Sequence, residues 1–178
     1  MAQVDLLING VISQNTATDA SKMESDDGST TNFLNTQQAT VSLDDMPSNV
    51  DAITSATIHI QGNIVPTKTI ANIDLKLLTS GGTMLREDAF NVDAPIAVNY
   101  TSDTWTTYIS GGATSAWNTT VVNDMRLQVK HAGNVSGLPT FLADFAFVRI
   151  VYTETVTSIP YIKLTSGKIT LLNGKISI

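Results

Sequence analysis

Alternation of apolar and polar residues recurs along this chain, and it is the feature that most constrains the fold. In residues 124–133, for example, Met125, Leu127 and Val129 alternate with arginine, glutamine and lysine. A repeat of two residues is the pattern of a strand with one buried face, because successive side chains of a strand point to opposite sides. Segments of this kind are residues 53–64, 72–82, 95–102, 104–112, 124–133 and 144–155. The sequence therefore predicts an all-β protein.

The composition of the chain supports the same class. Threonine, valine and isoleucine are abundant, whereas charged residues make up only 15% of the chain. β-branched residues fit the pleated surface of a sheet. The one helical candidate is a turn or two within residues 115–125.

Many strands joined by glycine-rich turns are typical of an antiparallel β-sandwich. The long polar connection in residues 14–40 favours a jelly-roll-like sandwich over a simple meander. We expect this connection to be irregular but ordered, because apolar residues punctuate it and the segment that follows. These anchors are Phe33, Leu34, Val41 and Leu43.

The segment 144–155 is apolar on both of its faces. Ala146, Val148 and Ile150 share one face, and Phe145 and Phe147 lie on the other. A strand of this kind is expected to be central in its sheet and covered on both sides.

With 178 residues, the chain has room for one domain and short extensions. We expect an N-terminal arm or strand in residues 1–14, a β-sandwich in residues 15–158 and a C-terminal β-hairpin arm in residues 159–178. Asn9-Gly10 and Asn173-Gly174 are strong signals for two-residue hairpin turns, because both central residues must take positive φ. A small hairpin is therefore predicted at each end.

Apolar residues of the two ends are the predicted interaction positions. They are Leu6, Leu7, Ile8, Ile159, Tyr161, Ile162, Leu164, Ile169, Leu171, Leu172, Ile176 and Ile178. A two-stranded hairpin is marginally stable by itself, so these side chains need cover. The hairpin either docks on a neighbouring chain or folds back over an edge of its own sandwich. We favour the arm, because Pro160 removes a ladder donor and extends the residue before it.

Charge and composition argue against several classes of function. The formal net charge is −6 and no cluster of lysine or arginine is present, which argues against nucleic acid as a partner. No stretch approaches the length of apolar sequence that crosses a bilayer, and the first residues do not read as a secretory signal, so no membrane partner is expected. The chain has no cysteine, which excludes disulfides and thiolate metal sites.

Two histidines are the candidates for an imidazole base. His59 lies among outward polar residues of a predicted strand, and His131 adjoins a glycine-containing turn. The chain lacks the G-x-S-x-G pattern of a nucleophile elbow. We interpret both histidines as surface residues and predict that the protein is not an enzyme.

Acidic pairs recur at Asp26 and Asp27, at Asp44 and Asp45, and at Glu87 and Asp88. Two carboxylates can act as acid and base at a defined separation, and oxygen ligands can hold calcium. The calcium-loop pattern is not matched, and Asx-rich turns form for backbone reasons alone. We therefore expect no catalytic pair, no metal and no cofactor, and leave calcium binding by the acidic loops open.

Aromatic residues gather in the middle of the chain. Trp105, Tyr108 and Tyr100 are candidates for a platform on which sugar rings stack, and Trp117 follows them. Trp105 shares a strand face with Ile109, so it is equally a candidate for the core.

The order of several segments resembles that of small virion proteins of tailed bacteriophages. The chain runs from "DDGSTTNFLNTQQATVSLDDMPSNVDAITSATIHIQGNI" through "LKLLTSGG", Trp117 and "VNDMRLQV" to "FAFVRIVYTE". This order, over residues 26–154, is similar to that of phage proteins with jelly-roll-like sandwiches, described as minor structural, decoration or tail-associated. The resemblance implies assembly on a capsid or tail, and it leaves out both predicted arms.

These observations together predict a non-enzymatic virion structural protein, assembled in the host cytoplasm. Capsid decoration as a cement protein is the first choice, because the chain is small, mildly acidic and without a repetitive shaft. Its expected partners are the major capsid protein, neighbouring virion subunits and further copies of itself, with a trimer favoured. The alternative is a tail- or fibre-associated sandwich that binds host glycans through Trp105, Tyr108 and Tyr100.

Overall fold

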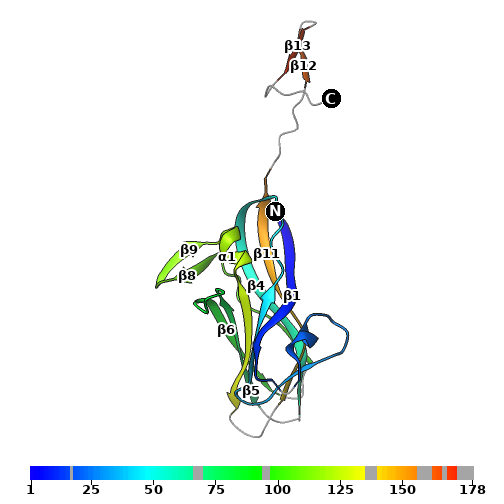
Figure 1. Ribbon diagram of the computed structural model, residues 1–178, viewed down its shortest axis with the longest axis vertical. Helices are drawn as coiled ribbons and strands as arrows, with labels where there is room; N and C mark the ends of the chain where they lie inside the picture. Colours follow the sequence, from blue (N-terminus) through cyan, green and yellow to red (C-terminus); the bar gives the residue numbers. More distant parts are fainter. Residues whose placement is uncertain are drawn as a thin grey trace.

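Strands make up most of the computed structural model, which describes residues 1–16, 18–65, 70–93, 97–134, 140–155, 162–165 and 168–171 (Figure 1). The strands are β1 (Ala2–Gln14), β2 (Thr31–Phe33), β3 (Gln38–Leu43), β4 (Val50–Val65), β5 (Ile70–Leu78), β6 (Met84–Asp93), β7 (Ala97–Thr101), β8 (Thr107–Ser110), β9 (Ala113–Ala116), β10 (Arg126–Asn134), β11 (Thr140–Glu154), β12 (Ile162–Thr165) and β13 (Lys168–Leu171). The helices are the 3-10 helix η1 (Ala20–Met23) and α1 (Thr119–Asn123). The predicted all-β class is confirmed, and α1 lies within the predicted helical segment.

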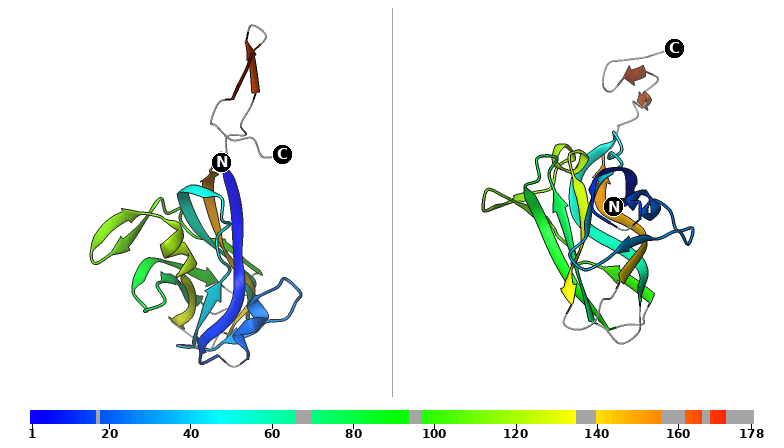
Figure 2. Two further views of the ribbon diagram at one scale, coloured as in Figure 1. Left: turned by 45° about the horizontal axis from the view of Figure 1, so that its top comes forward. Right: turned by 60° about the horizontal axis from the view of Figure 1, so that its bottom comes forward.

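The long strands form a curled antiparallel sheet whose two halves face each other (Figures 1 and 2). Sheet I has the order β1–β11–β4–β7, and sheet II has the order β3–β10–β5–β6. With these eight strands numbered along the chain, the orders are first–eighth–third–sixth and second–seventh–fourth–fifth. This is the arrangement of two interlocked Greek keys, so the predicted jelly-roll-like sandwich is confirmed.

Strand β1 belongs to both sheets. Residues up to Leu7 pair with β11, and residues from Ile8 onward pair with β3, with a register shift between Ile8 and Gly10. The predicted hairpin at Asn9-Gly10 is therefore wrong: Gly10 lies in a bulge of one continuous strand, and a bulge bends a strand without reversing it.

The N-terminal interaction positions are corrected by the same pairing. Leu6 is 0% exposed and Ile8 is 5% exposed, so both belong to the core of their own sandwich. Leu7 points the other way and keeps 38% of its surface exposed. Residues 2–14 are thus a strand of the sandwich, which is the second of the two forms expected for the N-terminus.

The core lies between the inward faces of the two sheets. It is built from the apolar members of the alternating segments, with Ile58 and Ile60 from β4, Leu127 from β10 and Val148 from β11 all fully buried. The period-two pattern is therefore the direct cause of the sandwich, because each sheet contributes one apolar face.

Strand β11 is central, as predicted. It pairs with β4 along one edge, and with β2 and then β1 along the other. The expected cover of its outward face is found in part, since Phe147 is buried and Phe145, Arg149 and Val151 are only partly exposed. Phe147 is only 8% exposed, because the rings of His59 from β4 and of Phe145 from β11 itself pack against its ring.

The connection between β1 and β3 is ordered, as predicted. The Asp19 side chain caps η1 by accepting a hydrogen bond from the Ser21 amide, 3.0 Å away. Met23 and Phe33 are fully buried. Leu34, one of the predicted anchors, is 45% exposed and does not serve as one.

The start of β1, the end of β11 and three connections meet at one end of the sandwich, which we call the terminal end. Its connections are residues 44–49, 79–83 and 102–125. Hydrogen bonds join them: the Met46 amide donates to Asn123 Oδ1 over 2.9 Å, and the Ser80 amide donates to Asp124 Oδ2 over 3.1 Å. Hydrogen bonds between the connections therefore hold the terminal end together as one surface.

The C-terminal hairpin forms from β12 and β13, which are antiparallel. Ile162 pairs with Leu171, and Leu164 pairs with Ile169. The predicted turn at Asn173-Gly174 lies outside the described residues, and in the described hairpin Thr165 pairs with Lys168. In Figures 1 and 2 this hairpin stands apart from the two sheets, beyond the terminal end.

His131 is not the surface residue that we expected. It continues the inward series of Leu127 and Val129 in β10 and is 0% exposed. Within the described part of the chain, neither of its ring nitrogens has a hydrogen-bond partner. Burial lowers the pKa of His131 below its usual 6.5, because the charged imidazolium is poorly solvated there.

This burial makes stability depend on pH. In the unfolded chain His131 takes up a proton near pH 6.5, whereas the folded chain resists it, so the free energy of unfolding should fall as the pH drops below about 6.5. We expect His131→Leu to flatten this dependence between about pH 6.5 and 5 in urea denaturation. His59→Gln is the control, because His59 is partly exposed and should account for less of the slope. An unchanged slope in His131→Leu would contradict the prediction.

Candidate interaction surfaces

The outer face of sheet I carries the first candidate surface. Cross-strand pairing places Leu7 opposite Phe147, Phe147 opposite His59 and His59 opposite Thr101, in one row across four strands. The adjacent row contains Asp5, Arg149 and Thr57. We call these seven residues the sheet I face.

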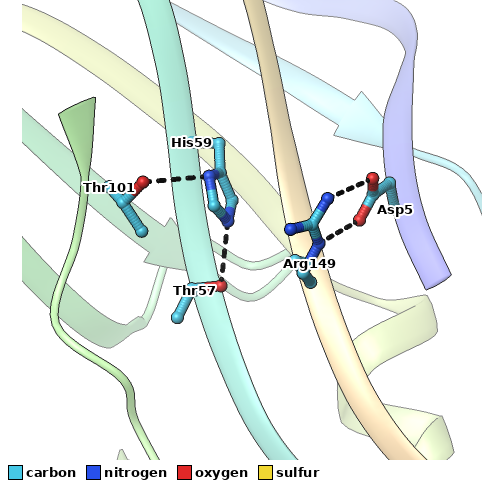
Figure 3. A network of polar contacts seen from close by, with 5 residues as sticks. All are labelled: Asp5, Thr57, His59, Thr101 and Arg149. Atoms are coloured by element: carbon cyan, nitrogen blue, oxygen red, sulfur yellow. Dashed lines mark hydrogen bonds and ion pairs between the residues drawn. The ribbon is translucent and has the colours of Figure 1, made fainter. Parts of the chain in front are cut away.

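Aromatic and charged groups lie against one another on this face, and Figure 3 shows the polar contacts among five of its residues. The His59 ring lies parallel to the Phe147 ring, with centroids 4.5 Å apart and an interplanar angle of 6°. The Arg149 guanidinium lies 5.4 Å from the centroid of the same ring. Arg149 also donates two hydrogen bonds to the Asp5 carboxylate, of 2.7 and 2.8 Å. Phe147 is thus flanked by two planar groups that limit its exposure.

The His59 ring is held by two threonine hydroxyls. Its Nδ1 lies 3.0 Å from Thr101 Oγ1, and its Nε2 lies 3.3 Å from Thr57 Oγ1. Burial, and then the nearby Arg149, lower the pKa of His59, which keeps the imidazole neutral at pH 7. Catalytic histidines are oriented by a third group such as a carboxylate, whereas here Asp5 is engaged by Arg149. The geometry suits a preformed contact surface of aromatic and arginine groups.

The Asp5–Arg149 pair should contribute modestly to stability. Both side chains are about one-third exposed, at 36% and 32%, so solvent screens the pair. We expect Arg149→Met to lower the free energy of unfolding by about 1 kcal/mol, and a double-mutant cycle with Asp5→Asn to give a coupling of about 0.5–1 kcal/mol in urea denaturation. A coupling of zero would show that the two bonds do not stabilise the fold.

The same pair affects acid stability. The hydrogen bonds from Arg149 hold the pKa of Asp5 below its usual 3.8. A lowered carboxylate pKa gives stability that is present above the unfolded value and is lost as the pH falls through the folded one. The contribution of Asp5 is therefore lost only below about pH 4.

The predicted aromatic platform is not formed. Trp105 is 8% exposed, because it packs in the core and its backbone bridges to Ala56 of β4. Trp117 is 4% exposed and donates its indole N–H to the Trp105 carbonyl over 2.8 Å. Trp105 thus has the core role that we weighed against the platform.

The two tyrosines of the predicted platform serve different contacts. Tyr100 stacks on Phe90, with ring centroids 4.1 Å apart, and donates to Asp88 over 2.8 Å. Burial and this hydrogen bond raise the pKa of Tyr100 to about 12. Tyr108 packs on Trp117 instead, with centroids 5.4 Å apart. The structure therefore does not bring Trp105, Tyr108 and Tyr100 together as one exposed surface.

The acidic pairs occupy separate environments. Asp27 accepts from the Ser29 amide over 2.8 Å, which lowers its pKa, as in an ordinary Asx turn. Asp144 of β11 lies near this turn, and burial together with Asp26 raises its pKa. Asp88 accepts from Tyr100 and from the Asp103 amide, so it braces the sandwich. Within the described ranges, no group of three or more histidine or acidic side chains is arranged to hold a metal ion.

The C-terminal interaction positions are only partly described. Ile162, Leu164, Ile169 and Leu171 lie in the β12–β13 hairpin. Ile159, Tyr161, Leu172, Ile176 and Ile178 lie outside the described residues.

Sequence reasoning missed the sheet I face. Phe147, His59 and Leu7 come from three distant segments, and their contact depends on the register between β11, β4 and β1. The available signal was weak: each residue is the outward member of an alternating segment.

None of the helices in the described ranges is long and apolar enough to cross a membrane. Comparison with protein-family models, with curated proteins and with solved structures finds no match to this chain.

Proposed function

We propose that this protein is a bacteriophage virion structural protein, and within that class a capsid decoration (cement) protein. The observation that carries the proposal is the C-terminal hairpin, which stands apart from the sandwich at its terminal end (Figure 1). A hairpin of two four-residue strands is marginal in water unless a partner covers it. We therefore infer that a partner covers the hairpin when the protein is in its working state.

The register of the hairpin gives it one apolar face. Residues that pair directly share a face, so positions 162, 164, 169 and 171 lie together, and the sequence fills them with isoleucine and leucine. Covering each of these side chains contributes about 1.5–3 kcal/mol. Backbone groups at the hairpin edges add directional bonds to a partner strand. Such an arm is suited to fastening a rigid sandwich to a neighbouring subunit of a virion.

The jelly roll is compatible with this role and does not by itself determine it. The architecture is used by viral capsid proteins and by lectins. Glycan binding was the alternative, and it rested on an exposed Trp105. Because Trp105 is buried, the residues that suggested a sugar platform no longer favour it.

The proposal is tested with particles from the phage whose genome encodes the chain. A tagged full chain should co-sediment with purified capsids that lack it and should raise their resistance to heat or chelator. The chain that ends at residue 158 should keep the circular dichroism of the sandwich and no longer co-sediment. Absence of the protein from purified particles, together with failure to bind them, would refute a virion role.

A matched pair of variants isolates the apolar face of the hairpin. Leu164→Asn with Ile169→Asn changes that face without changing charge, and Thr165→Asn with Thr170→Asn changes the opposite face. We expect the first pair to weaken particle binding strongly and the second to leave it nearly unchanged. Equal effects would mean that the apolar face does not mediate binding.

A further inference from the structure

Charge is divided unevenly between the sandwich and the arm of residues 159–178. The arm contains Lys163, Lys168 and Lys175 and no acidic residue, so its formal charge is +3. The preceding residues contain the other seven lysines and arginines and all sixteen acidic residues, a formal charge of −9. A basic segment is thus attached to an acidic body of the same chain.

The register of the hairpin separates its apolar and basic positions. Lys163 pairs with Thr170, and Thr165 pairs with Lys168, so these four positions share the face opposite to the isoleucine and leucine positions. A surface that complements this hairpin needs an apolar area for the isoleucine and leucine positions and carboxylates for the lysines.

The terminal end offers a partly apolar hollow with one carboxylate in its lining, and further carboxylates in its connections. Six exposed carboxylates lie in its connections and strand ends. Among the described residues, the basic side chains in the same region are two, Arg86 and Arg126. The carboxylates are Asp44, Asp45, Asp51, Asp103, Asp124 and Glu154. Asp51 lines an open hollow of about 240 Å³, whose apolar lining includes Val50, Ile53 and Trp117. The hollow lies beside the root of the arm, since the Thr155 amide donates to the Asn49 carbonyl over 2.8 Å.

We propose that the arm of one copy docks on the terminal end of a second copy, with its apolar positions toward the hollow and its lysines toward the surrounding carboxylates. The charge division favours a copy of the same chain as the occupant, because the acceptor surface and the arm have opposite signs. The hairpin forms a two-stranded sheet of its own, separate from the nine-stranded sheet, and a hairpin of this size needs cover from a partner. Each copy carries one arm and one acceptor, so exchange gives a symmetric dimer, a ring or, where the rotation between copies does not close, an open filament.

This inference deepens the proposed function, since it names the partner of the same arm, but it is tested on the isolated protein. In analytical ultracentrifugation the full chain should form a concentration-dependent oligomer, and the chain ending at residue 158 should sediment as a folded monomer. Raised salt should weaken the oligomer, because salt screens the attraction between the arm and the exposed carboxylates. A monomeric full chain at every concentration would overturn the inference, even if the protein still bound particles. An oligomer that survives removal of the arm would overturn it as well.

Charge exchange tests the assigned surface. Lys163→Glu with Lys168→Glu should weaken association by about tenfold or more, and so should Asp45→Lys with Asp51→Lys. The four changes combined in one chain should restore association. Asp26→Lys with Asp27→Lys is the control, because it changes the same charge in the β1–β3 connection, away from the terminal end, and should leave the oligomer intact. Failure of the combined chain to recover, or equal loss in the control, would overturn the assignment to the terminal end.

Discussion

Gly62→Ala is expected to lower the free energy of unfolding by about 3 kcal/mol or more, which is a large share of the roughly 5–15 kcal/mol that stabilises a folded domain. Gly62 lies in β4 opposite Ala143 of β11, next to the register shift between Ala143 and Phe145. A Cβ atom on residue 62 would overlap the carbonyl oxygen of Leu142 and lie 3.0 Å from the Ala143 Cα. These are backbone atoms of the central strand, so the clash is relieved only if β4 and β11 separate. Separation would break ladder hydrogen bonds in the middle of sheet I.

Gly81→Ala is the matched control. A Cβ at residue 81, in the connection between β5 and β6, has Thr79 Oγ1 at 3.7 Å as its nearest neighbour, an ordinary contact. We expect this variant to unfold within about 0.5 kcal/mol of the unchanged protein. Urea denaturation followed by tryptophan fluorescence compares the two. A Gly62→Ala midpoint equal to that of Gly81→Ala would show that the strands are not packed as closely as described.

The alternating segments predicted the central strands because their pattern is imposed by burial on one face. β4, β5, β10 and β11 all lie where the apolar residues recur at every second position. β6 was not predicted, since Arg86, Glu87 and Asp88 interrupt its pattern. Among the described strands, β6 pairs with β5 alone and is an edge of sheet II, where charged residues are tolerated and discourage further pairing.

The continuity of β1 was beyond local reasoning. Asn9-Gly10 is a strong turn signal over short range, but β1 has β11 as a partner before Gly10 and β3 as a partner after it. The Asn9 side chain, which would favour a turn, instead donates to the Leu43 carbonyl over 2.9 Å. Two sets of long-range ladder bonds therefore outweigh one local preference.

Long-range pairing also decided whether the aromatic and histidine side chains are buried or exposed. His131 extends the buried series of β10 by one more alternate position, so its burial was readable from the period and was missed because the nearby glycine suggested a turn. For Trp105 the alternating pattern did not decide between core and surface. The residue precedes β8 and is held by an isolated bridge to Ala56. The pairing partner, which sequence alone does not name, decides between core and surface.

Phe33→Ala is the second change with a large expected effect, and it tests whether a polar connection is part of the core. Phe33 is fully buried, and its ring lies 6.0 Å from that of Phe141, at an interplanar angle of 30°. Removing a buried phenylalanine side chain costs about 3–5 kcal/mol, from lost transfer free energy and from the cavity left behind. Leu34→Ala is the control, because Leu34 is 45% exposed and should cost no more than about 0.5 kcal/mol.

The cost should be concentrated where β2 completes sheet I. β1 pairs with β11 only from Phe147 to Tyr152, and β2 pairs with Phe141, Leu142 and Ala143, so β2 occupies the stretch of β11 that β1 leaves open. Loss of the Phe33 ring should therefore raise amide hydrogen exchange in β2 and η1 more than in β4 or β10. Uniform exchange across the strands would mean that the connection unfolds only with the whole sandwich. Equal stability of Phe33→Ala and Leu34→Ala would mean that the residues between β1 and β3 are not part of the core.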